Sequence, residues 1–316
     1  MTTSSFEPER AVKSDTDSNG SQSSGNPVIR HKYTADPTAI VYNDAVYLYA
    51  GHDEAPVGTE AYRMHEWLCF SSLDMVRWTE HRVPLKPTDF SWASGDAYAS
   101  KVIHHHDKFY WYVAVTHRSI PGKAIGVAIA EHPAGPFRDA KGSALITNDM
   151  IHAPADSKNN LDPTVIIDDS GRAHLFWGNS QCYYAKLKEN LIELDGPIMT
   201  IALPGFTEGA CLYSRNGWYY LAYGYGFPEK VAYAMSRDVE GPWEFKGILN
   251  ELAGNCKTNR PAFLDFKGKS YFIYHNGGLK NGGSHRRSVC IDYLYVNPDN
   301  TLKRIMMTSE GVSHAV

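Results

Sequence analysis

Five segments of this 316-residue chain share one pattern, in which a short apolar strand turns into an aromatic strand. The segments recur every ~40–60 residues, a period typical of a β-propeller in which each repeat forms one blade. Turn residues separate the strands, and no long amphipathic helix pattern is present. We therefore predict an all-β fold, a five-bladed β-propeller. The first position of the repeat holds, in chain order, Asp36, Ala99, Asp162, Glu208 and Arg260.

The length and composition fit one propeller domain. All-β proteins of this size often form a single domain, and 43% hydrophobic residues are sufficient for a core. Residues 1–26 are mostly polar, and a segment with so few apolar residues cannot offset the entropy lost on ordering. We predict a flexible polar N-terminal segment over residues 1–26 and a five-bladed β-propeller catalytic domain over residues 27–316.

Charge and cysteine content exclude several classes of protein. The formal net charge is −4 without a long run of either sign, so we expect no nucleic-acid or membrane partner. The five cysteines are widely spaced, which predicts buried free thiols rather than a disulfide framework or a zinc site. The N-terminal tract has no apolar segment typical of a signal peptide, which leaves a cytoplasmic protein or a truncated secreted form open.

The first positions of the repeats carry the strongest functional signal. Strand starts in a propeller lie at one mouth of the central channel, so Asp36, Asp162 and Glu208 are expected to converge. A single Asp-Pro-Thr is a common turn, but it occurs here twice at equivalent positions of the repeat. Glycoside hydrolysis needs one ionised carboxylate to activate water and one protonated carboxyl to protonate the leaving oxygen. A third carboxylate can keep the pKa of that acid high.

The chain resembles glycoside hydrolase family 43, of the arabinofuranosidase/xylosidase type. The matching segments include the two Asp-Pro-Thr motifs, a Glu-Gly-Ala motif and a Tyr-His-Asn-Gly motif, at residues 33–38, 160–164, 206–210, 242–243, 274–277 and 287–295. The resemblance implies a propeller enzyme acting on arabinose- and xylose-containing plant polysaccharides. It implies Asp36 as the general base, Glu208 as the general acid, and Asp162 as the residue that tunes and orients Glu208.

Three further residues are candidates at the same site. The resemblance implies that Arg287 binds sugar hydroxyls and that His275 binds a structural calcium ion on the axis, mostly through waters. Because calcium prefers oxygen ligands, a core histidine remains an alternative for His275. Trp92, on a loop before the second repeat, is expected either to stack on a pentose ring or to pack between blades. Arg260 stands where many relatives carry histidine, which leaves the substrate contacts of that blade open.

We therefore expect an inverting glycosidase that releases terminal α-L-arabinofuranosyl residues from arabinoxylan-type polysaccharides or oligosaccharides. A β-xylosidase or a bifunctional enzyme is an alternative, because both sugars present similar hydroxyls to one pocket. A non-catalytic propeller that binds glycans is an alternative of another class, although it would not need acids at three equivalent positions. The expected chemistry uses no cofactor.

Overall fold

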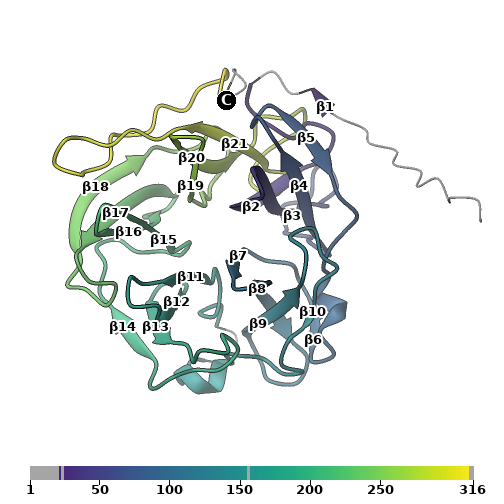
Figure 1. Cartoon of the computed structure of the whole chain (residues 1–316). Coiled ribbons are helices and arrows are strands. Elements are labelled where there is room, and N and C mark those ends of the chain that lie inside the picture. The colour runs from purple at the N-terminus through teal and green to yellow at the C-terminus, as the bar shows by residue number, and fades with distance from the viewer. Residues whose placement is uncertain (1–20, 23–24, 155–156, 313–316) are drawn as a thin grey trace, which may run out of the picture.

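A computed structural model describes residues 21–22, 25–154 and 157–312 of the chain, with their strands in five antiparallel sheets around one axis (Figure 1). The prediction of a five-bladed β-propeller is confirmed. Two short 3-10 helices, η1 (Pro87–Asp89) and η2 (Asn148–Ile151), interrupt the strands. Over the described ranges, no helix has the length and apolar character needed to cross a membrane. Most of the segment predicted to be flexible, residues 1–20 and 23–24, lies outside the described residues.

Each sheet is one blade, and its first long strand lies nearest the axis (Figure 1). Blade one contains β1 (Ser21–Gln22), β2 (Thr34–Tyr42), β3 (Ala45–His52), β4 (Trp67–Ser72) and β5 (Arg77–Glu80). Blade two contains β6 (Ala93–Gly95), β7 (Ser100–His105), β8 (Lys108–His117), β9 (Lys123–Ala130) and β10 (Arg138–Asp139). Blade three contains β11 (Thr164–Ile167), β12 (Ala173–Trp177), β13 (Cys182–Lys186) and β14 (Met199–Ile201). Blade four contains β15 (Cys211–Arg215), β16 (Trp218–Tyr225), β17 (Lys230–Ser236) and β18 (Glu244–Asn250), and blade five contains β19 (Ala262–Phe266), β20 (Lys269–Asn276) and β21 (Ser288–Tyr293).

The turns predicted from the sequence close the inner hairpins. Asn43 and Asp44 join β2 to β3, with φ values of 47° and 59°. Asn216 and Gly217 join β15 to β16, with φ values of 52° and 68°. Two successive residues with positive φ form the hairpin turn whose twist matches that of the flanking strands, and Asn, Asp and Gly adopt it most readily. The turn chemistry therefore sets the register of each inner strand.

Aromatic strands build a core between every two neighbouring blades. Successive side chains of a strand point to opposite faces, so each blade contributes to the core on either side of it. On β3, Leu48 packs toward blade five and Tyr49 packs toward blade two. On β8, Trp111 packs toward blade one and Tyr112 toward blade three. The five cysteines are buried and free, as predicted from their spacing.

The two ends of the described chain close the ring. The backbone N–H of Asn26 donates to the carbonyl oxygen of Ser309 at 2.8 Å, and the backbone N–H of Val28 donates to the carbonyl oxygen of Val289 at 2.9 Å. The segment before β2 therefore runs beside β21 and extends the three-stranded sheet of blade five. Earlier in the chain, β1 pairs with β5. Blade one and blade five are thus joined by main-chain hydrogen bonds as well as by a shared core.

Truncation of Trp111 tests the role of the inter-blade cores. Trp111 is fully buried, and its indole N–H donates to the Ser100 hydroxyl at 2.8 Å. Trp111→Ala is expected to lower the free energy of unfolding by about 3–5 kcal/mol, because it leaves a large cavity between two blades. Met306→Ala, at a residue 76% exposed, is the matched control and should change it by less than about 0.5 kcal/mol. Urea unfolding followed by circular dichroism measures both, and equal effects would contradict this account of the core.

Candidate active site

The two Asp-Pro-Thr motifs share an unusual backbone. Asp36 and Asp162 adopt left-handed conformations, with φ values of 50° and 56°. In β2, the pairing with β3 shifts between Ala35 and Thr38, so Asp36 lies in a bulge next to a proline that has no N–H to offer the sheet. The free N–H of Asp36 donates instead to Nδ1 of His275 at 3.2 Å. Asp is among the residues that tolerate this conformation, which is found at functional sites where surrounding contacts hold it.

Gly209 links the third and fourth repeats. It has a φ of 72°, and its N–H donates to Oδ2 of Asp162 at 2.9 Å. A Cβ at this position would lie 3.0 Å from side-chain atoms of Arg260. Glycine therefore permits both the local backbone and the close approach of the fifth repeat, and it places Glu208 directly beside Asp162 and Arg260.

The first residues of all five repeats meet at one pocket. Its volume is about 440 Å³, within the usual range for small-molecule sites, and its lining includes all five of these residues, Asp36, Ala99, Asp162, Glu208 and Arg260. Below it lies a cavity of about 30 Å³, lined by Asp36, Ala99, Asp162 and Arg260 and by the residues that follow each of the five positions. The axial channel is thus nearly closed at this level, and the acids predicted from the repeat lie at its wide end.

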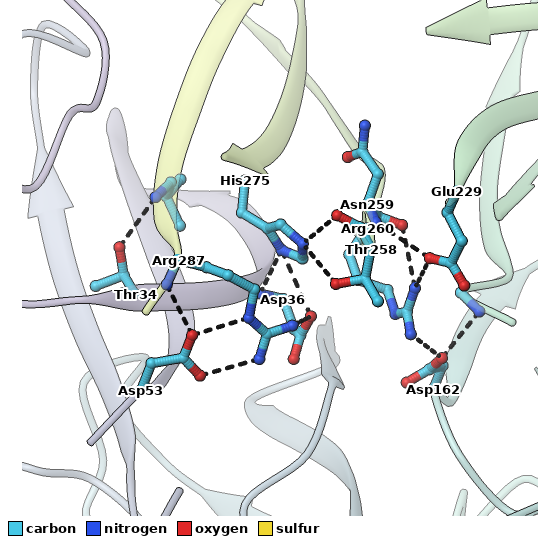
Figure 2. Close-up of polar contacts among 12 residues, drawn as sticks. Thr34, Asp36, Asp53, Asp162, Glu229, Thr258, Asn259, Arg260, His275 and Arg287 are labelled. Atoms are coloured by element: carbon cyan, nitrogen blue, oxygen red, sulfur yellow. Dashed lines mark hydrogen bonds and ion pairs between the residues drawn. The ribbon is translucent and has the colours of Figure 1, made fainter. Parts of the chain in front are cut away.

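Arg287 organises one side of the pocket around Asp36. Its Nε and Nη2 donate to the two oxygens of Asp53 at 2.8 and 3.0 Å, and its Nη1 donates to Oδ1 of Asp36 at 2.9 Å (Figure 2). The two-point contact with Asp53 fixes the plane of the guanidinium, so the third contact has a defined direction. Arg287 therefore lines the pocket as expected, and it also holds the carboxylate of Asp36. Sequence reasoning missed Asp53, which belongs to no repeat motif.

His275 lies between the two buried guanidinium groups and is fully buried. Its Nδ1 accepts the N–H of Asp36, and its Nε2 lies 3.0 Å from the carbonyl oxygen of Thr258 (Figure 2). Burial, and then the charges of Arg287 and Arg260, hold its pKa well below the ordinary value. These contacts occupy both nitrogens of a neutral ring; the calcium contact that the resemblance implies, mostly through waters, stays a prediction. The described residues also contain no group of three or more His, Cys, Asp or Glu side chains arranged for a metal.

Arg260 organises the opposite side of the pocket. Its Nη2 contacts Oδ2 of Asp162 at 3.1 Å, and its Nη1 donates to Oε2 of Glu229 at 3.0 Å (Figure 2). Nη2 also pairs with Glu208. All four side chains are largely or fully removed from solvent. One guanidinium group therefore contacts three carboxyl groups. Arg260, whose contacts the sequence left open, is the centre of this cluster.

The pKa values in the Arg260 cluster move in opposite directions. Burial raises the pKa of Asp162 to about 8, and the charge of Glu208 adds to this effect while that of Arg260 opposes it. Burial also raises the pKa of Glu208, but the charge and hydrogen bonds of Arg260 and a hydrogen bond from Asn179 bring it below the ordinary value. The directions of these shifts favour a proton on Asp162 over one on Glu208 in the free protein. Protonation of Glu208 for general acid catalysis stays a prediction.

The aromatic residues of the pocket are not the one proposed from the sequence. Trp92 packs within blade two, where its indole N–H donates to Asp139 at 2.9 Å and its ring stacks on His117. It is not among the residues that line the pocket. Tyr62 and Phe227 do line it, and Phe227 is 71% exposed. Phe227 lies in the turn between β16 and β17, where polar residues are usual. A large apolar residue in such a turn is the sequence signal that could have identified it.

Carboxyl groups that share one pocket are what glycoside hydrolases use to cleave glycosidic bonds. A sequence profile described as "Glycosyl hydrolases family 43" matches residues 24–302, and the chain belongs to this family.

The relatives found by sequence and by structure are named as arabinofuranosidases or xylosidases. An arabinoxylan arabinofuranohydrolase of Bacillus subtilis strain 168 is 28% identical over 91% of this chain, which spans 65% of that relative's length. Xylosidase/arabinosidase 43A of Humicola insolens is 27% identical over 87% of this chain and 98% of its own. The solved structure of an α-L-arabinofuranosidase from Clostridium thermocellum ATCC 27405 superposes with a TM-score of 0.76, at 30% identity over 92% of this chain and 98% of that one.

Removal of Asp53 tests how strongly the Arg287 network depends on it. Asp53→Ala leaves the buried guanidinium with only one of its two carboxylate partners, so the free energy of unfolding should fall by about 3–5 kcal/mol. Glu244→Ala breaks the surface ion pair with Lys246 at a side chain that is 71% exposed and is the control, expected to lower it by less than about 1 kcal/mol. Urea unfolding measures the free energy of unfolding of both variants. A small decrease for Asp53→Ala would contradict a structural dependence on the Asp53–Arg287 pair.

Proposed function

We propose that the protein is an inverting glycoside hydrolase that releases terminal α-L-arabinofuranosyl residues from arabinoxylan-type polysaccharides or oligosaccharides. The observation that carries this proposal is the division of the pocket acids into two electrostatic environments. Asp36 lies against Arg287, whereas Asp162 and Glu208 share Arg260 with a third carboxyl group. Paired carboxyl groups in different environments are what acid and base catalysis of glycoside cleavage require.

In this proposal Asp36 is the general base. Oδ1 accepts from Arg287, and the N–H of the same residue donates to His275, so both its side chain and its backbone are fixed. A water molecule bound at the carboxylate would transfer a proton to it while the water oxygen bonds to the anomeric carbon. Arg287 would also donate to sugar hydroxyls that reach the pocket floor, since a guanidinium offers five N–H groups.

The acid side must supply a proton to the leaving oxygen. Three carboxyl groups around one guanidinium cannot all be ionised without mutual repulsion, so the cluster retains a proton near neutral pH. Glu208 is the more accessible of the two acids in the repeat motifs, with 14% of its side chain exposed against 5% for Asp162. In this proposal Asp162 retains the proton in the free enzyme and passes it to Glu208, its neighbour on Arg260, when substrate binds; Glu208 then donates that proton to the leaving oxygen. No step of this chemistry runs through a metal ion or cofactor.

The choice of arabinofuranosyl groups rests on the names of the relatives, among which arabinofuranose recurs. The Humicola insolens relative is named for both xylose and arabinose, so β-xylosidase activity is the second candidate. A non-catalytic glycan-binding propeller is the alternative of another class. It provides no reason for a buried, proton-retaining acid cluster in the pocket, and loss of turnover on mutation separates it from an enzyme.

Substitution of the two proposed catalytic acids tests the function directly. Asp36→Ala is expected to lower kcat/KM on nitrophenyl α-L-arabinofuranoside by about 10²–10⁴-fold, the usual contribution of a general base. Glu208→Gln should cause a loss of the same order on methyl α-L-arabinofuranoside but a much smaller one on the 2,4-dinitrophenyl glycoside, which needs little protonation. Release of pentose is measured, and proton NMR of the first anomer formed tests inversion.

The control for these variants is Glu244→Gln, an exposed carboxyl on β18. Full activity of Glu208→Gln on the methyl glycoside would overturn the acid assignment. If the unmodified protein turned over no arabinofuranoside or xyloside but bound the oligosaccharides, the binding module would be the better description.

Phe227 is proposed to contact the part of the substrate that leaves. A stacked ring contributes about 0.5–1.5 kcal/mol, or roughly 2- to 12-fold in an equilibrium constant. Phe227→Ala should raise KM by this factor for arabinoxylo-oligosaccharides and leave KM for methyl α-L-arabinofuranoside unchanged, because the latter has no second sugar. Arabinose release at graded substrate concentrations measures both, with Met306→Ala as the exposed apolar control. An equal rise for both substrates would contradict a contact with the leaving sugar.

A further inference from the structure

Glu229 is the one member of the Arg260 cluster, among the described residues, that the proposed reaction does not use. It lies just before β17 and outside the repeat positions, yet only 2% of the residue is exposed. Its carboxyl group accepts from Nη1 of Arg260 at 3.0 Å, from the N–H of Asn259 at 3.1 Å and from the hydroxyl of Thr207 at 3.1 Å. A buried carboxyl group held by three donors is a built arrangement rather than an accident of packing.

Within the described ranges, Arg260 is the cation that contacts Glu229. The neighbouring Lys230 forms its ion pair with Glu251 at 2.9 Å, on the outer side of the blade. Lys257 meets Glu229 through the main chain, where its carbonyl accepts the N–H of Glu229 at 2.9 Å.

The other donors to the carboxyl group of Glu229, the N–H of Asn259 and the hydroxyl of Thr207, are neutral. A side-chain hydrogen bond also joins Glu229 to Glu208, so these two acids share a proton directly as well as through Arg260. The charge of Glu229 is therefore directed at the guanidinium that also contacts the proposed acid.

We propose that Glu229 is a positioning residue for the acid side of the pocket: it holds Nη1 of Arg260, directs Nη2 to Asp162 and Glu208, and supplies the surplus negative charge that keeps a proton in the cluster. The inference rests on the proposed function of the same site. With Glu229, one guanidinium faces three carboxyl groups; without its charge, it faces two. The remaining pair would then lose its proton at a lower pH, because one source of repulsion is gone.

The pKa values in the cluster agree with this geometry. Burial raises the pKa of Glu229 to about 7, with the charge of Arg260 opposing and that of Glu208 adding to the shift. The charge of Glu229 in turn contributes to the raised pKa of Asp162. Removing a neighbouring negative charge lowers the pKa of a carboxyl group, so the activity that depends on the shared proton should disappear at a lower pH.

Glu229→Gln tests the proposal with little change in shape. The amide oxygen can still accept from Arg260 and Asn259, and the Thr207 hydroxyl can reverse its hydrogen bond. We expect the basic limb of the kcat/KM profile to move down by about one pH unit, the effect of a close charge in a buried site. Near neutral pH, kcat/KM on methyl α-L-arabinofuranoside should fall about tenfold, and that on the 2,4-dinitrophenyl glycoside by less than about threefold.

A role in packing alone predicts something different. It would lower kcat/KM on both glycosides equally and leave the pH profile in place, and either result overturns the proposal. Glu244→Gln serves as the control for a carboxyl removed from the same blade without contact to Arg260. Circular dichroism establishes that the variants fold. If Glu229→Gln does not fold, Glu229→Asp is the second variant, because it keeps the charge but withdraws it from Nη1 of Arg260. It should shift the basic limb in the same direction by a smaller amount. An unchanged pH profile would overturn the inference.

Failure of the proposed function gives a separate result. If the unmodified protein hydrolyses neither the methyl nor the dinitrophenyl arabinofuranoside, and neither xyloside, the proposed function is wrong and the role of Glu229 in its acid falls with it. If the unmodified protein hydrolyses them with a bell-shaped profile and Glu229→Gln shifts nothing, the function stands and only this inference is wrong.

Discussion

Packing of aromatic strands between blades is the constraint on which the rest of the structure depends. Each strand sends alternate side chains to two neighbours, as Trp111 and Tyr112 do on β8, so no blade can rotate without disturbing two cores. This fixes the inner strands around the axis, and it brings Asp36 and Glu208, which are far apart in sequence, to one pocket. The precision of the site is therefore a consequence of side chains well away from it.

The pocket concentrates more negative charge than it can hold fully ionised. Its two guanidinium groups face five carboxyl groups, those of Asp36, Asp53, Asp162, Glu208 and Glu229. Burial and mutual repulsion raise the pKa values of Asp162 and Glu229, so part of this imbalance is relieved by retaining protons. The imbalance is uneven, since Arg287 has two partners and Arg260 has three. In our proposal, a base and an acid thus arise from the same residue types. Asp36 shares Arg287 with one other carboxyl group, whereas Glu208 shares Arg260 with two.

The repeat in the sequence was sufficient to predict the fold and the meeting of the three acids. Strand alternation and turns such as Asn43-Asp44 are local signals, and a repeated local signal places equivalent residues around an axis. The partners of those acids were not predictable in the same way. Asp53 and Glu229 belong to loops and turns outside the repeated strands, and their role follows from the guanidinium groups that three-dimensional packing brings to them.

The same distinction explains the aromatic residues. Trp92 precedes an inner strand and was a reasonable candidate for the pocket mouth, but the loop folds back so that its ring covers Gly126 and stacks on His117. Phe227 comes from a hairpin turn of blade four, and its position over the pocket depends on how far that hairpin reaches. Strand periodicity does not encode the length or direction of loops. Pocket residues that come from loops are therefore harder to predict than those at the starts of the repeated strands.

Arginine at the fifth repeat position has a consequence for the acid it contacts. A permanent cation beside Glu208 favours the ionised carboxylate, which opposes the role of a proton donor. The same guanidinium also contacts Asp162 and Glu229, and in our proposal this sharing keeps a proton available to the acid side of the pocket. Gly209 allows Arg260 to approach closely enough for all three contacts. A neutral side chain at position 260 would remove both the opposition and the need for Glu229, so the two residues are best understood as one functional unit.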